Sequence, residues 1–307
     1  MQAQDVTLSA IDALSRDVPR EVLLNAEEVR FLRRKLTARI IYAVLAAVTA
    51  AAVAILFIIV GYILLKGVTG LNLSFFINTS KPVGQEGGGI AEAILGSLVM
   101  LAVASLLAIP FGIAAAVYLA EYGKGRFASA VRFCVELLAS LPSIVVGVFI
   151  WALIVRHLTG FSGLAGAAAL AVIMIPIIAR SVEEILRLVP NSLREAALAL
   201  GVPSWRVTMQ VVIPAVLPGI LTGIVLSVAR AAGETAPLML TALGNSFINF
   251  DLQQPMAAIP LQIYNYALSP YPDWQQKSWT ATLVLVFVIA VFSAAVRFAM
   301  RKFRYVR

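Results

Sequence analysis

Two charged residues, Arg230 and Glu234, stand inside an otherwise apolar run of the chain. Charged side chains in a membrane-length segment are costly, and they usually face a bundle interior or a water-filled path. A spacing of four residues places the two on one helix face, where they can pair. A planar guanidinium suits a tetrahedral oxyanion because it donates paired hydrogen bonds, and a neighbouring carboxylate could moderate its grip. The pattern indicates an anion path, with a structural ion pair at a helix end as the alternative.

Three other polar residues in apolar segments have two interpretations each. Arg180 is expected at the end of a span, where it either extends to the interface or lies at the inner mouth of the path. Ser140 and Ser143 flank Pro142. Their hydroxyls could line the path, or they could satisfy the backbone carbonyl that a proline frees.

Two further features are expected to be structural. Glu136 follows Arg132 by one helical turn, so we expect these two residues to form an ion pair. Small residues at helix-packing spacings are expected to allow helices to approach closely, namely Gly163, Gly166, Gly219 and Gly223.

The composition is that of a membrane protein. Of the 307 residues, 61% are hydrophobic and 13% are charged, whereas charged residues make up about a quarter of a soluble globular domain. The long uncharged runs predict an all-α polytopic membrane protein. One cysteine and one histidine cannot form a disulfide framework or a multi-histidine metal site within the chain, so we predict no metal.

The sequence favours transport over catalysis. It contains no Gly-x-x-x-x-Gly-Lys-Ser/Thr phosphate-binding loop, so the chain is not expected to hydrolyse nucleotide itself. No catalytic residue is predicted. The energy for transport is expected to come from a partner chain or from an ion gradient.

Six segments are long and apolar enough to cross a membrane. They are residues 40–65, 94–119, 133–155, 162–179, 211–232 and 279–296. The third segment is interrupted at Pro142. Together they form a predicted six-helix transmembrane domain, residues 40–296, between an N-terminal tail at 1–39 and a C-terminal tail at 297–307.

The positive charges orient these spans. Of the 24 Lys and Arg residues, Arg230 is intramembrane and four lie on one side of the spans, namely Lys66, Lys81, Arg156 and Lys277. The other nineteen lie in the tails and in the loops of the opposite side, which the positive-inside rule assigns to the cytoplasm. Both termini and the connector 180–210 are therefore predicted to be cytoplasmic, and the segment 237–278 external. The tail 1–39 is expected to be solvated rather than a cleaved signal peptide, and the net charge of +8 indicates no nucleic-acid partner.

The connector is predicted to hold a short helix, a break and a new helix start. Residues 195–200 are rich in Ala and Leu and favour a helix. Gly201 is expected to end it, and Pro203 follows where a terminated helix tolerates proline. A short rigid helix between two spans suits docking by a partner chain, with an ordinary loop as the alternative.

One pattern in the connector resembles the EAA loop of ABC importer permeases: Glu195-Ala196-Ala197, three residues, Gly201, nine residues, Val211, one residue and Ile213-Pro214. The later stretch RAAGETAPLM, from Arg230 to Met239, resembles the phosphate-specific (Pst) transporter permeases. The motif IPLQIYNYALSPYPDW, from Ile259 to Trp274, points to the A-type subunit of that system. The resemblance covers nearly the whole chain after the N-terminal tail.

This resemblance implies a type I ABC importer permease fold with six transmembrane helices. It implies that the chain is a permease subunit of an ATP-driven importer for inorganic phosphate in the bacterial inner membrane. The implied partners are a related C-type permease subunit, two copies of a cytoplasmic ATPase subunit and an external phosphate-binding protein. ATP and magnesium would bind to the ATPase subunits, with no cofactor on this chain.

Two sets of site residues are predicted. The predicted substrate path contains Arg230, Glu234, Arg180, Ser140 and Ser143. The predicted contact that couples the chain to the ATPase contains Glu195, Ala196, Ala197 and Gly201.

Three alternatives stay open. The first is a permease for another oxyanion, such as molybdate or sulfate, against which the motif at residues 230–239 is the discriminator. The second is a gradient-driven secondary transporter or channel that works alone, against which the segment 195–201 argues. The third is a membrane scaffold or sensor subunit that does not itself transport.

Overall fold

The computed structural model describes residues 20–82, 84–85 and 87–304. The chain divides into two compact units, Met1–Tyr62 and Ile63–Arg307. The described part of the first unit is a single helix, the beginning of α2 (Arg20–Gly67). Residues 20–39 of the predicted tail are therefore helical and continuous with the first predicted span, while residues 1–19 lie outside the described residues.

The second unit is built from helices. Between the end of α2 and the core lie two short elements, η1 (Val68–Gly70) and α3 (Leu73–Ile77). The longer helices, in chain order, are α4 (Ala91–Val117) with its π-helical end η2 (Tyr118–Tyr122), α5 (Gly125–Ser140), α6 (Ser143–Ile150) with η3 (Trp151–Thr159), α7 (Gly163–Arg187), α9 (Ser204–Val207) with η4 (Thr208–Val212) and α10 (Ile213–Ala232), and α13 (Pro272–Arg304). Three short helices stand between them, α8 (Asn191–Ala199), α11 (Ala236–Thr241) and α12 (Ile259–Ala267).

The predicted membrane spans are present, with longer bounds. In the described chain five helices are long and apolar enough to cross a membrane, and a sixth span is formed if the bent pair α5 and α6 counts as one. That pair bends by 103° at residues 141–142, because Pro142 cannot continue the helix. The helices exceed the predicted spans because polar residues at their ends continue the helical hydrogen bonding; α7 runs to Arg187 rather than to residue 179.

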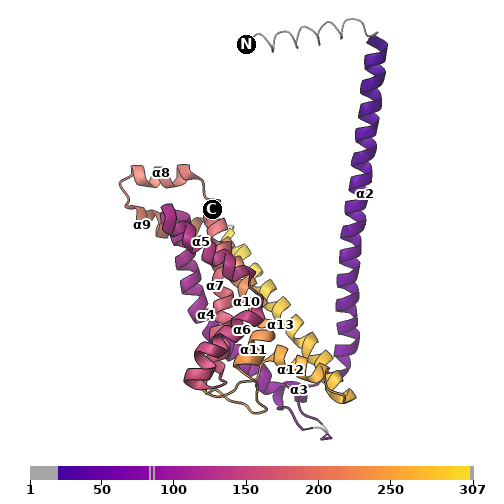
Figure 1. Cartoon of the computed structure of the whole chain (residues 1–307), viewed down its shortest axis with the longest axis vertical. Helices are drawn as coiled ribbons and strands as arrows, with labels where there is room; N and C mark the ends of the chain where they lie inside the picture. The colour runs from indigo at the N-terminus through magenta and orange to yellow at the C-terminus, as the bar shows by residue number, and fades with distance from the viewer. Residues whose placement is uncertain (1–19, 83, 86, 305–307) are drawn as a thin grey trace. The chain divides into compact units, whose positions relative to one another are not determined.

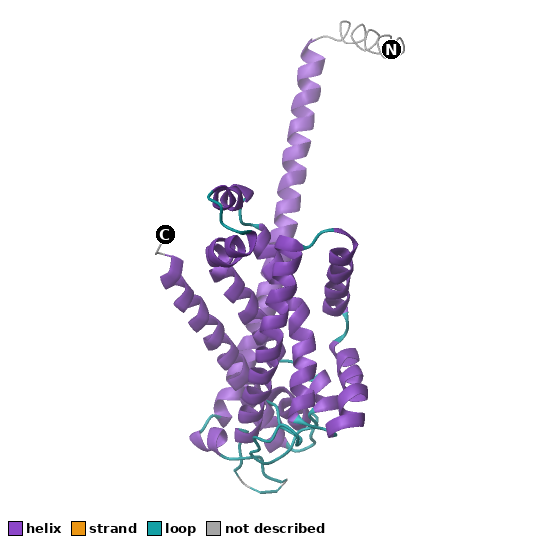
Figure 2. Ribbon diagram, turned by 90° about the vertical axis from the view of Figure 1, so that its left-hand side faces the viewer, coloured by secondary structure: helices purple, strands orange, loops and turns teal. Residues whose placement is uncertain are grey.

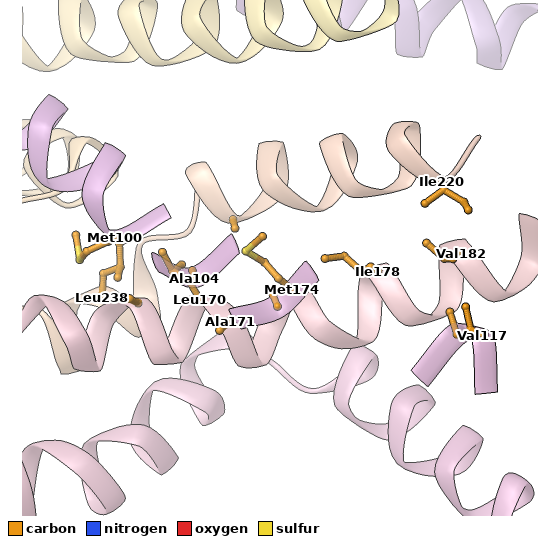
Figure 3. Close-up of a cluster of buried hydrophobic side chains, with 14 of the residues drawn as sticks. Met100, Ala104, Val117, Leu170, Ala171, Met174, Ile178, Val182, Ile220 and Leu238 are labelled. Carbon is orange, nitrogen blue, oxygen red and sulfur yellow. The ribbon is translucent and has the colours of Figure 1, made fainter. Parts of the chain in front are cut away.

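Helix α7 is the axis of the second unit. Its start is fixed by Ser162, whose hydroxyl accepts a hydrogen bond from the Ala165 N–H at 3.2 Å. Pro190 follows its end, where proline discourages a further turn. Figure 3 shows the buried side chains that α7 shares with α4, α10 and α11, among them Met100, Leu170, Met174, Ile178, Ile220 and Leu238. Because α7 is covered by these neighbours, most of its apolar window is buried within one chain.

Small residues let neighbouring helices approach α7 closely. A Cβ atom at Gly219 would lie 2.9 Å from Ile185, and one at Gly223 would lie 3.0 Å from Ser181. Gly166 and Gly163 are equally crowded, by Met100 and Met256 respectively. The expected role in helix packing is confirmed for Gly166, Gly219 and Gly223, whereas Gly163 packs against Met256, which lies outside the helices.

The two ends of the second unit differ. Figure 1 shows α8, α9 and the C-terminal end of α13 at one end, with α3 and α12 at the other, and Figure 2 shows most of the loops gathered at that second end. The predicted external segment 237–278 is not wholly a surface loop. Its first part lies in α11, whose Leu238 is buried in the core, because six apolar and small residues can pack there without a full span.

Candidate functional site

Arg230 and Glu234 meet at the end of α10. The helix ends at Ala232, and Gly233 follows with its N–H bonded to the Arg230 carbonyl at 3.1 Å. The prediction that both residues lie on one helix face is therefore wrong, because Glu234 stands beyond the last turn. The pair still forms across the cap, with 3.9 Å between Arg230 Nε and Glu234 Oε1. A cation in the last turn also complements the helix dipole.

The Arg230 guanidinium is loosely held and accessible. Its side chain is 59% exposed, while that of Glu234 is 16% exposed. A separation of 3.9 Å is longer than a charge-assisted hydrogen bond, so Glu234 does not hold the guanidinium through such a bond. An exposed arginine in a membrane-length helix requires a partner or a wet path beside it.

Helix α6, which follows the break after α5, packs against α11, which begins soon after Glu234. Helix α11 lies against α6, where a Cβ atom at Gly147 would come within 2.8 Å of Pro237. Ser143 begins α6, one turn before Gly147. The Ser140 hydroxyl donates to the Leu137 carbonyl at 2.8 Å, so it satisfies the backbone at the end of α5.

Arg180 is not at the end of its helix, contrary to the prediction. Helix α7 continues for seven residues to Arg187. Arg180 is 60% exposed, and its Nε lies 3.2 Å from Glu184 Oε1 on the same helix. Arg180, like Arg230, is thus accessible and paired with a carboxylate four residues on.

A buried ion-pair network joins α5 to α7. Arg132 donates from Nε and Nη2 to Glu183 Oε1, at 3.1 and 2.8 Å, and Arg187 Nη2 approaches the same oxygen at 2.7 Å. The expected pair between Arg132 and Glu136 is wrong, because Glu183 offers a buried carboxylate while Glu136 is exposed. Sequence spacing could not reveal this contact, since its partners lie 51 residues apart.

The coupling residues lie as predicted in a helix, a break and a second helix. Glu195, Ala196 and Ala197 fall in α8, and Glu195 and Ala196 are exposed. Gly201 has φ of 78° and ends the helix in the left-handed conformation that glycine adopts readily. The bounds of the connector are shorter than predicted, because α7 extends to Arg187 and α9 begins at Ser204.

The aromatic motif at Ile259 to Trp274 builds a polar cavity at the end opposite α8. The cavity measures about 560 Å³, and its wall includes Ser80, Asn245, Tyr266 and Trp274. Tyr266 is buried, and burial raises the pKa of its phenol. The sequence predicted an external loop here, so the cavity was not predicted.

Solved structures share this fold. A chain of the MetNI methionine ABC transporter, in an inward-facing conformation, aligns with a TM-score of 0.59 at 21% identity over 70% of this chain and 97% of that chain. A chain of the bacterial alginate ABC transporter aligns with a TM-score of 0.57 at 13% identity over 83% of this chain and 92% of that chain. The model of the family "binding-protein-dependent transport system inner membrane component" matches residues 108–305. Fold and family model together define the class as the type I ABC importer permeases.

Comparison with proteins of similar sequence identifies the family within this class. The phosphate transport system permease protein PstA of Pasteurella multocida is 45% identical over 226 residues, which are 73% of this chain and 80% of the relative. PstA of Yersinia pestis is 41% identical over 240 residues, 77% of this chain and 81% of the relative. The chain belongs to this PstA family of binding-protein-dependent transport permeases. The predicted six-span permease fold and the resemblance to the A-type subunit are confirmed.

Proposed function

We propose that this chain is a membrane-spanning subunit of an ATP-driven importer that moves inorganic phosphate across the bacterial inner membrane. The observation that carries the proposal is the accessible Arg230 at the end of a membrane-length helix, held only loosely by Glu234. The phosphate specificity named for the PstA relatives supports it.

Arg230 supplies the attraction for the anion. A guanidinium donates paired hydrogen bonds to phosphate oxygens, and its charge is permanent. Glu234 stands close enough to compete for the guanidinium, at 3.9 Å, but not close enough to saturate it. The carboxylate therefore limits how tightly phosphate is held, so that the anion leaves again.

The other proposed path residues differ in how strongly their surroundings support a contact with the anion. Arg180 is accessible and paired with Glu184 in the same manner as Arg230 with Glu234, which supports a second anion contact. Ser143 is the first residue of α6, the helix that packs against α11. Ser140 contributes less, because its hydroxyl already bonds a backbone carbonyl.

The energy comes from a partner in this proposal. A cytoplasmic ATPase subunit, which binds ATP and magnesium, contacts the exposed face of α8 through Glu195, Ala196 and Ala197, with Gly201 setting the turn that follows. Two such subunits, a related C-type permease and an external phosphate-binding protein complete the importer, and both termini of this chain are cytoplasmic. No cofactor is proposed on the chain itself.

The test is phosphate uptake and ATP hydrolysis by the reconstituted complex carrying Arg230→Ala. Loss of an anion-binding donor is expected to reduce uptake by about 100-fold, while stimulation of ATP hydrolysis by the binding protein is retained. Arg230→Lys should be intermediate because it keeps the charge but loses the planar fork. Arg297→Ala, an exposed arginine of α13, is the matched control.

Two outcomes would count against the proposal. If Arg230→Ala fails to assemble, or loses ATP hydrolysis together with uptake, Arg230 is a structural residue. If the unaltered complex moves sulfate or molybdate in place of phosphate, the substrate is another oxyanion. Uptake without any ATPase subunit would indicate a secondary transporter.

A further inference from the structure

The side chain of Arg194, next to the predicted coupling residue Glu195, uses all five of its N–H donors. Its Nε donates to Glu121 Oε2 at 3.1 Å, and its Nη2 donates to Glu121 Oε1 at 2.7 Å and to the Leu186 carbonyl at 2.9 Å. Its Nη1 donates to the Val189 carbonyl and to Asn191 Oδ1. The guanidinium is therefore saturated and fixed in direction.

This one side chain joins three elements. Arg194 belongs to α8, Glu121 belongs to η2 at the end of α4, and the carbonyls of Leu186 and Val189 lie at the C-terminal end of α7. The last carbonyls of a helix have no partner within the helix, so Arg194 satisfies groups that would otherwise need water. The Arg194 and Glu121 side chains are only 18% and 9% exposed.

A second contact ties the other end of the connector to the same turn. The Tyr122 hydroxyl and Thr208 Oγ1 lie 3.1 Å apart, and the Thr208 hydroxyl donates its own hydrogen bond to the Ser204 carbonyl. Tyr122 is therefore the donor to Thr208, which lies in η4 at the start of the next span. Two neighbouring residues of η2, Glu121 and Tyr122, hold the entry and the exit of the connector.

Apolar burial does little to hold α8. None of its nine residues, all of which the structure describes, is buried, and Ala197 alone among them packs, partly buried, against the hydrophobic core. An isolated helix of this length is unstable in water. The polar contacts of Arg194 are thus the main attachment of α8 to the membrane helices.

We propose that the Glu121–Arg194 pair is the joint that transmits movement of α8 to α4 and α7, with Tyr122–Thr208 as its second tie. Glu121 and Arg194 are positioning residues, because they act through α8 rather than on the substrate. A bidentate pair allows little sliding, so α8 moves with the ends of both helices as one body. Without the pair, α8 pivots between Pro190 and Gly201, and the ATPase turns over without moving the spans. This inference rests on the proposed function for its energy source.

The test compares Glu121→Gln with the unaltered chain in the reconstituted complex. The amide keeps the size of the side chain but loses its charge. We expect basal ATP hydrolysis to persist and the phosphate moved per ATP to fall by about tenfold, within the range of measured couplings between sites. Arg194→Lys should lower the phosphate moved per ATP to a similar extent, because lysine has three donors for the five acceptors that Arg194 contacts. Asp273→Asn, a carboxylate paired with Lys277 at the start of α13, is the matched control.

A distance measurement separates failure of the joint from failure of the proposed function. Spin labels on Ser192→Cys in α8 and Lys124→Cys after η2, in a Cys134→Ala background, report the joint whatever the substrate is. One narrow distance, unchanged by ATP, is expected for the unaltered pair, and a broad distribution for Glu121→Gln. A narrow distance together with unchanged coupling in Glu121→Gln overturns the joint.

If Glu121→Gln does not assemble, Tyr122→Phe tests the second tie by removing one hydroxyl. It should lower the phosphate moved per ATP by less than Arg194→Lys does, and an unchanged ratio in both variants also overturns the joint. If the unaltered complex moves no phosphate, the proposed function fails, and the label distances still decide whether the joint is rigid.

Discussion

Charged residues of the second unit fall into two groups that differ in exposure. The Glu121 and Glu183 carboxylates are 9% exposed. Glu121 pairs with Arg194, 73 residues away, and Glu183 pairs with Arg132, 51 residues away, and with Arg187 on its own helix. Arg180 and Arg230 are about seven times as exposed, and each has one carboxylate four residues on. Buried charges need close partners, because an unpaired one costs several kcal/mol. The first group therefore serves architecture, and the second is available to a ligand or a partner.

Replacing Glu183 tests the architectural group. Glu183→Gln should destabilise the complex by about 1–3 kcal/mol, because Arg132 and Arg187 lose a charged acceptor and are themselves partly exposed. The measurement is the thermal unfolding midpoint of the purified complex. Asp273→Asn, which changes an exposed carboxylate 3.9 Å from Lys277 Nζ, should leave the midpoint unchanged. Equal effects of the two substitutions would contradict the distinction.

At the scale of elements, the connector behaves as a short rigid piece between two long helices. Helix α8 is bounded by Pro190 on one side and by Gly201 on the other. Gly201 has φ of 78° with open space around its Cβ position, so the conformation rather than crowding demands glycine there. The direction in which the chain leaves α8 depends on this one residue.

Substitution of Gly201 tests this dependence. Gly201→Ala should cost about 1–2 kcal/mol at the turn, because a Cβ atom is disfavoured in the left-handed conformation. We expect weaker stimulation of ATP hydrolysis by the binding protein and slower uptake. Gly201→Asn is the control, since asparagine adopts this conformation more readily. If alanine and asparagine behave alike, the backbone conformation does not determine coupling.

Short sequence patterns predicted features that depend on neighbouring residues, and they missed contacts between residues far apart in the sequence. Arg230 was found because a charge in an apolar run is conspicuous, and the bend at Pro142 because proline breaks helices. Glu121 and Arg194 were missed because 73 residues separate them, so no spacing rule connects them. Helix α11 was assigned to a loop because six residues are too few to show a helical period.

At the scale of the whole molecule, the second unit presents two unlike ends. One end carries α8 and the other carries α12 (Figure 1). The cavity of about 560 Å³ lies at the α12 end. The positive-inside rule predicts that the α8 end faces the cytoplasm. In that orientation the cavity would open on the external side.

Chemical labelling of intact cells tests this orientation. In a Cys134→Ser background, a membrane-impermeant maleimide should modify Ser246→Cys, an exposed position in the wall of the cavity, and should spare Lys124→Cys near α8. Permeabilised cells should show both modifications. Labelling of Lys124→Cys alone in intact cells would reverse the topology.

The π-helical turn η2 has a consequence for changes of chain length. A π-helical turn holds one residue more than a regular turn, and successive side chains of a regular helix leave the axis about 100° apart. Glu121 and Tyr122 can point to two different ends of the connector because they are neighbours on such a turn. Deleting a single residue between Tyr118 and Tyr122 would rotate both side chains away from their partners together. The turn should therefore accept some exchanges of residue type, while an insertion or deletion detaches α8 and η4 in one step.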